Sequence, residues 1–67
     1  MELREVESSN ISKIGHEEDT LYVQYKSGVT YKYKEVPKAL YEEFLAADSK
    51  GRFMNSKVKG KFEYERA

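Results

Sequence analysis

The sequence lacks cysteine altogether and holds one histidine and one proline in 67 residues. Without cysteine, the chain can form neither a disulfide nor a thiolate zinc site. The segment His16-Glu17-Glu18-Asp19 has no recognised metal-ligand spacing, and we find no nucleophile elbow, phosphate loop or dinucleotide fingerprint. We therefore expect a protein that is not an enzyme and that uses no metal or cofactor.

Long hydrophobic runs are also missing. No stretch approaches the roughly 20 apolar residues of a membrane span, and the polar start from Met1 to Glu7 does not resemble a secretory signal. The chain is too short for a second hydrophobic core. We expect a monomeric cytoplasmic protein with a single domain over residues 1–67, in which residues 1–5 are disordered.

The net charge is zero, but the charges are unevenly distributed. Residues 49–61 hold five lysines and arginines and no acid, and residues 26–34 hold three lysines and no acid. The acids gather in residues 1–25 and 35–48. A zero net charge disfavours polyanion binding by the molecule as a whole, although a local basic patch remains compatible with it.

The stretch from Thr20 to Lys34 predicts a β-hairpin, because apolar and polar residues alternate on both sides of Ser27-Gly28. A two-residue turn would place lysines on the apolar face. A three-residue loop, residues 26–28, avoids this, and Gly28 supplies the positive φ that such a loop needs. The side chains predicted to share the inner face are Leu21, Val23, Tyr25, Val29, Tyr31 and Tyr33.

A first strand is predicted from Asn10 to His16. Its apolar anchors Ile11 and Ile14 are three residues apart, which indicates a bulge near Lys13. The charged residues 16–19 then form the loop into the hairpin. These segments together predict a three-stranded antiparallel meander.

Two helices are predicted after Val36-Pro37, since proline favours the first position of a helix. Residues 37–47 have an amphipathic pattern, and Ser49 is a candidate N-cap for a short helix to about residue 56. The remaining apolar residues, Val58, Phe62 and Tyr64, indicate an extended tail. The predicted fold is α+β, with both helices on one face of the meander.

The order of several short motifs now carries a family resemblance. The motifs are Ser8-Ser9-Asn10-Ile11, Ile14-Gly15, Ser27-Gly28, Tyr31-x-Tyr33, Val36-Pro37, Ser49-x-Gly51-x-Phe53 and Phe62-x-Tyr64. This order resembles the KTSC domain family, which is named for a domain at the C-terminus of some lysyl-tRNA synthetases and includes small free-standing bacterial proteins. Two residues depart from the family pattern: His16 stands where an aromatic such as Tyr is common, and position 53 holds Phe rather than Tyr. The resemblance implies a link to RNA and no defined activity.

The first candidate binding site is Ser49-Lys50-Gly51-Arg52 at the start of the second helix. A helix N-terminus disfavours cations unless an anion is present, so Lys50 and Arg52 there favour a phosphate site, and Gly51 would let the anion approach the backbone. The alternative is a tight interhelical turn whose cations are solvated.

The second candidate is the run Lys57, Lys59 and Lys61, followed by Phe62 and Tyr64. Cations interleaved with aromatic rings suit single-stranded RNA. The alternative, which the sequence favours, is that both rings belong to the core and the lysines keep an edge strand soluble.

The outer sheet face gives a third candidate, made of Tyr22, Lys32 and Lys34. The predicted register places Tyr22 opposite Lys32, so a cation–π pair is the simpler account. Tyr31 and Tyr33 are interpreted as core residues whose hydroxyls reach the rim.

The function predicted from these sites is weak binding of RNA or another phosphate-bearing ligand by a small accessory module. The alternative is a protein-interaction module that uses the sheet edge or the outer face, with lysines serving only solubility.

Overall fold

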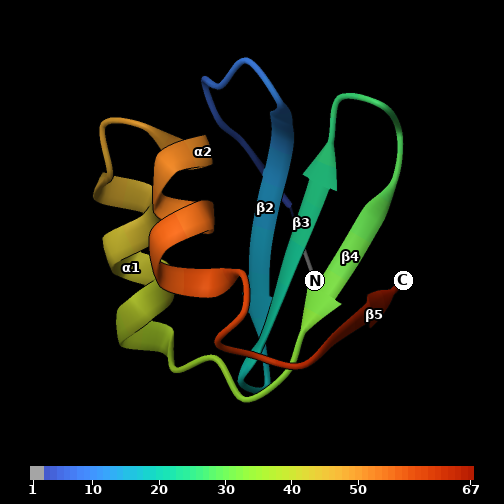
Figure 1. Cartoon of the computed structure of the whole chain (residues 1–67), viewed down its shortest axis with the longest axis vertical. Coiled ribbons are helices and arrows are strands. Elements are labelled where there is room, and N and C mark those ends of the chain that lie inside the picture. Colours follow the sequence, from blue (N-terminus) through green and yellow to red (C-terminus); the bar gives the residue numbers. More distant parts are fainter. Residues whose placement is uncertain (1–2) are drawn as a thin grey trace.

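The predicted hairpin forms the centre of a five-stranded antiparallel sheet in the computed structural model, which describes residues 3–67 (Figure 1). The strands lie in sequence order across the sheet, and the helices lie together on one of its faces. The elements are β1 (Arg4–Glu5), β2 (Ile11–Glu17), β3 (Thr20–Tyr25), β4 (Thr30–Tyr33), α1 (Lys38–Ala46), α2 (Lys50–Phe53), the π-helix η1 (Met54–Val58) and β5 (Tyr64–Arg66).

The hairpin register agrees with the prediction. Leu21 pairs with Tyr33 and Val23 pairs with Tyr31. The three-residue loop is closed by the Tyr25 amide, which donates to the Val29 carbonyl at 2.8 Å. Gly28 has a φ of 99°, the positive value that the loop requires. A slip by one residue would have buried lysines, which is why the polarity pattern fixed this register.

The bulge predicted in the first strand is confirmed. The pairing of β2 with β3 shifts between Ile11 and Lys13. The extra residue turns both Ile11 and Ile14 inward, and both are buried.

The predicted three strands are wrong, because short strands at the two ends of the chain widen the sheet to five. Arg4 of β1 pairs with Ile14, and Tyr64 of β5 pairs with Tyr33. Residues 1 and 2 of the segment expected to be disordered lie outside the described residues. Strands of two and three residues are too short for alternation to reveal them, and β5 depends on a partner distant in sequence.

The second helix begins as predicted and ends later. Ser49 caps it, since its hydroxyl accepts a hydrogen bond from the Arg52 amide at 3.3 Å. A π-helical turn continues the helix, closed by the Lys59 amide and the Met54 carbonyl at 2.7 Å. Val58, which we expected in an extended tail, is therefore helical and buried.

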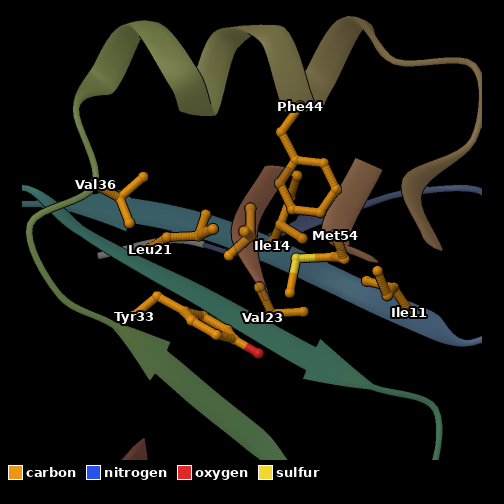
Figure 2. Packing of buried hydrophobic residues seen from close by; sticks show 9 residues of the cluster. Ile11, Ile14, Leu21, Val23, Tyr33, Val36, Phe44 and Met54 are labelled. Carbon is orange, nitrogen blue, oxygen red and sulfur yellow. The ribbon is translucent and has the colours of Figure 1, made fainter. Parts of the chain in front are cut away.

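One hydrophobic core lies between the helices and the inner face of the sheet, defined here as the face that carries Leu21, Val23 and Tyr33. Figure 2 shows Phe44 of α1 pointing at the sheet residues, with Met54 beside it. The Phe44 ring also stacks on Phe53, with centroids 5.0 Å apart. The buried residues are Ile11, Ile14, Leu21, Val23, Tyr33, Val36, Phe44, Met54 and Val58. Over residues 3–67 no helix has the length and apolarity of a membrane span.

Candidate nucleic-acid interface

Four tyrosines line the part of the inner face formed by β3, β4 and β5. Figure 1 shows α1 and α2 on the β2 side of the sheet, with β4 and β5 extending beyond them. Tyr31 contacts Tyr25 and Tyr64 edge to face, with centroids 5.8 Å and 5.6 Å away, and Tyr64 lies 5.4 Å from Tyr33. The rings therefore form one continuous cluster, and the helices leave part of it open.

An open hollow of about 770 Å³ adjoins these rings, and we call it the tyrosine hollow. The hairpin loop borders it at Ser27, and the turn after η1 borders it at Lys59 and Gly60. Parts of the two basic segments seen in the sequence therefore meet here. The lining consists of Asn10, Tyr25, Ser27, Val29, Tyr31, Tyr33, Lys59, Gly60 and Tyr64, and it includes one cation and no acid.

The tyrosines of the hollow differ in exposure. Tyr33 is 3% exposed, whereas Tyr64 is 61% exposed. Burial, helped by a hydrogen bond with Tyr25, raises the pKa of Tyr33 above its usual range, so its hydroxyl stays protonated at neutral pH. Among the tyrosines of the hollow, Tyr33 is therefore buried and Tyr64 presents the most exposed ring.

The first predicted site, residues 49–52, lies where α1 gives way to α2. The Lys50 ammonium donates to the Ala47 carbonyl at 2.6 Å and to the Leu45 carbonyl at 3.1 Å. It therefore satisfies carbonyls at the C-terminal end of α1, a contact that also suits the helix dipole. Arg52 is exposed, and a Cβ added at Gly51 would meet no atom within 4 Å.

The second predicted site lies at the end of η1 and in the turn that follows. Lys57, Lys59 and Lys61 are exposed, and within residues 3–67 none of them forms an ion pair. Phe62 is half-buried against the core, which matches the alternative interpretation for that ring. Tyr64 instead lies exposed on the inner face, and it lines the hollow together with Lys59.

The third predicted site on the outer face has the expected register, since Tyr22 pairs with Lys32. Strand β5 adds a residue that the sequence did not suggest there, because Glu65 lies 3.3 Å from Lys32 and 3.5 Å from Lys34. A hydrogen bond from Lys32, with the charge of Lys34, lowers the pKa of the Glu65 carboxyl. This carboxylate offsets part of the positive charge of the outer face.

The histidine stands where the predicted strand 10–16 and the predicted loop 16–19 meet, and the structure places it in the strand. Strand β2 includes His16, whose Nε2 lies 2.6 Å from the Val36 carbonyl and whose ring stacks on Tyr41 of α1 at 5.4 Å. The turn itself is shorter and consists of Glu18 and Asp19, both with positive φ. Within residues 3–67, no group of three or more histidines and acids is arranged to hold a metal ion.

Comparison with known proteins agrees with the motif order. The model of the KTSC domain matches residues 7–62, which is most of the chain. The chain belongs to the KTSC family. A solved structure of a KTSC domain protein from Yersinia pestis is 38% identical and superposes with a TM-score of 0.91, covering 98% of this chain and 96% of that one.

Relatives of this KTSC domain occur alone and within larger proteins. A protein of Tsukamurella paurometabola is 42% identical over 62 residues, which are 90% of this chain and 92% of the relative. A lysine–tRNA ligase of Nostoc punctiforme is 38% identical over 61 residues. That match spans 88% of the KTSC domain described here and 11% of the ligase.

Sequence reasoning missed the tyrosine hollow, because Tyr31 and Tyr33 were interpreted as core residues. That interpretation holds for Tyr33, which is buried, but Tyr31 is only half-buried. The missing information was the pairing of β5, which adds Tyr64 to the same face. The alternation Tyr64-x-Arg66 was a weak signal for that strand.

Proposed function

We propose that this KTSC domain is a small accessory module that binds single-stranded RNA weakly through its phosphates. The observation that carries the proposal is that Lys57, Lys59 and Lys61 are exposed and that Lys59 lines a hollow together with aromatic rings. Proteins that bind single-stranded nucleic acids commonly combine cationic side chains with aromatic rings on which the bases stack. A related segment occurs in a lysine–tRNA ligase, an enzyme whose name includes tRNA, and this relationship supports the proposal of RNA binding.

The proposed phosphate contacts extend from the lysines to the start of α2, at Ser49, Lys50, Gly51 and Arg52. Lys50 has three N–H donors and gives two of them to the carbonyls of α1, which leaves one for a phosphate. Arg52 is exposed and free to form a bidentate contact. Since few groups take part and the net charge of the protein is zero, we expect low affinity and strong salt dependence.

A titration of the labelled domain at low salt tests the proposal. Hexauridylate, and separately inorganic phosphate, should shift the amide signals of residues 50–52 and 57–61. The variant K57Q/K61Q should weaken hexauridylate binding and reduce the slope of log K against log salt by about 0.7 for each lost contact. The matched control K32Q/K34Q removes the same charge from the outer face and should bind nearly as tightly as the wild type.

The opposite pattern would favour another function. If neither probe moves residues 49–61, RNA binding there is excluded. If a purified protein partner then shifts residues 20–34, the domain is a protein-interaction module that uses its sheet. If K32Q/K34Q loses more affinity for hexauridylate than K57Q/K61Q does, the RNA site lies instead at Tyr22, Lys32 and Lys34.

A further inference from the structure

We infer that the tyrosine hollow holds one unpaired RNA base, with Lys59 beside the phosphate next to it. The inference rests on the proposed function and adds to it the part of the RNA that is recognised. The proposed phosphate contacts include none of the tyrosines of the hollow. The inference therefore adds these aromatic rings to the proposed RNA interface.

The first argument is the exposure of Tyr64. It is the one large hydrophobic side chain within residues 3–67 that is mainly exposed, at 61%. It lies in an ordered strand, paired with Tyr33, and it contacts the rings of Tyr31 and Tyr33. A ring held at fixed orientation by other rings is a preformed stacking surface, which binds a base at little entropic cost.

The second argument is charge. Strand β5 alternates, so Tyr64 and Arg66 share the inner face while Glu65 points to the outer face and pairs with Lys32 and Lys34. Arg66 lies opposite Tyr31 in the register. The β5 acid thus faces away from the hollow, whose lining includes Lys59 and no acid. This arrangement suits a ligand with a planar ring and an adjoining negative charge.

The third argument is size and hydrogen bonding. A volume of about 770 Å³ falls in the range of small-ligand sites and leaves room for one nucleotide. Asn10, Ser27 and the tyrosines among its lining residues have side chains that carry hydrogen-bond donors and acceptors. Such groups can bond the edge of a base that is splayed out of a single strand.

The experiment compares the binding of hexauridylate with that of an abasic ribose-phosphate chain of the same length, for the wild type and three variants. Tyr64→Leu removes the ring and keeps an apolar residue in β5. Tyr64→Phe keeps the ring. Tyr22→Leu makes the same change as the first variant on the opposite face of the sheet and is the matched control. Circular dichroism and thermal unfolding check that all four proteins are folded.

We expect the wild type to bind hexauridylate at least about five-fold more tightly than the abasic chain, since each stacked base contributes measurably to affinity. Y64L should bring this ratio close to one and leave the abasic affinity unchanged, while Y64F and Y22L keep the wild-type ratio. Hexauridylate should shift the ring signals of Tyr31 and Tyr64, and the abasic chain should not.

Two results would overturn the inference and leave the proposed function standing: equal affinity of the wild type for both chains, or an unchanged ratio in Y64L. If neither chain binds at low salt, the proposed function fails, and the base site fails with it. The abasic chain therefore separates the two failures.

Discussion

The Nζ atom of Lys50 lies 2.6 Å from the carbonyl oxygen of Ala47, directly after the last turn of α1. The same ammonium reaches the Leu45 carbonyl at 3.1 Å. Helix α1 has no basic residue in its own last turn, so Lys50 supplies from the next helix the cation that this end lacks. The residue that looked out of place at the start of α2 is thus accounted for by the end of α1.

Lys50→Met should therefore destabilise the domain. The variant keeps the length of the side chain but leaves two carbonyls without a donor, and we expect the free energy of unfolding in urea to fall by about 1–2 kcal/mol. Lys57→Met is the matched control, because Lys57 is exposed and helical but its ammonium bonds no carbonyl of residues 3–67, and it should change stability by less than about 0.5 kcal/mol. Equal effects of the two variants would contradict a capping role for Lys50.

His16 should contribute through two separable contacts, a hydrogen bond to the Val36 carbonyl and a stack on Tyr41. His16→Ala loses both and should cost about 2 kcal/mol of unfolding free energy. His16→Phe keeps an aromatic ring against Tyr41 and should cost about half as much. Urea denaturation at neutral pH measures the difference, and a phenylalanine variant as unstable as the alanine variant would mean that the stack contributes nothing.

The hairpin was predictable because its polarity pattern admits one register only. With Val23 opposite Tyr31, the alternating apolar residues of both strands face inward, and any shift by one residue buries lysines. The bulge at Ile11 and Lys13 was predictable for the same reason, since two isoleucines three apart can share a face only with an extra residue between them.

Several features that escaped prediction depend on partners distant in the sequence. Tyr64 joins the sheet by pairing with Tyr33, and His16 bonds the Val36 carbonyl and stacks on Tyr41. A local sequence pattern carries no information about contacts between residues that are distant in the sequence. The tyrosine hollow combines several of them, so it became visible only with the whole fold.

Two glycines should respond in opposite ways to the same substitution. Gly28→Ala should cost about 1–2 kcal/mol, because Gly28 has a φ of 99° that an L-residue adopts only with strain. Gly51→Ala should gain about 0.5–1 kcal/mol, because Gly51 is helical and a Cβ there meets nothing within 4 Å. Thermal unfolding of both variants checks the signs, and a stabilised G28A would contradict the loop geometry.

Gly51→Ala also tests the proposed phosphate contact at the start of α2. If a phosphate approaches the backbone at this glycine, the added methyl group should weaken binding of inorganic phosphate although the protein becomes more stable. Stability and binding would then move in opposite directions in one variant. Unchanged phosphate binding in a stabilised G51A would confine the proposed contact to Lys57, Lys59 and Lys61.

The ion pairs of Glu65 with Lys32 and Lys34 should make stability depend on pH in the acid range. The pKa of Glu65 is lower in the folded protein than in the unfolded chain, so its contribution is fully present above about pH 4.3 and is lost as the pH falls through the lowered folded value. Glu65→Gln should therefore lower the urea midpoint at pH 7 and low salt but hardly change it at pH 2. Added salt should shrink the difference at pH 7, because Glu65 and its lysine partners are exposed to solvent.

Glu63→Gln is the control, since no ion pair involving Glu63 occurs within residues 3–67. A loss in E65Q that is the same at both pH values would mean that the side chain acts through packing and not through its charge.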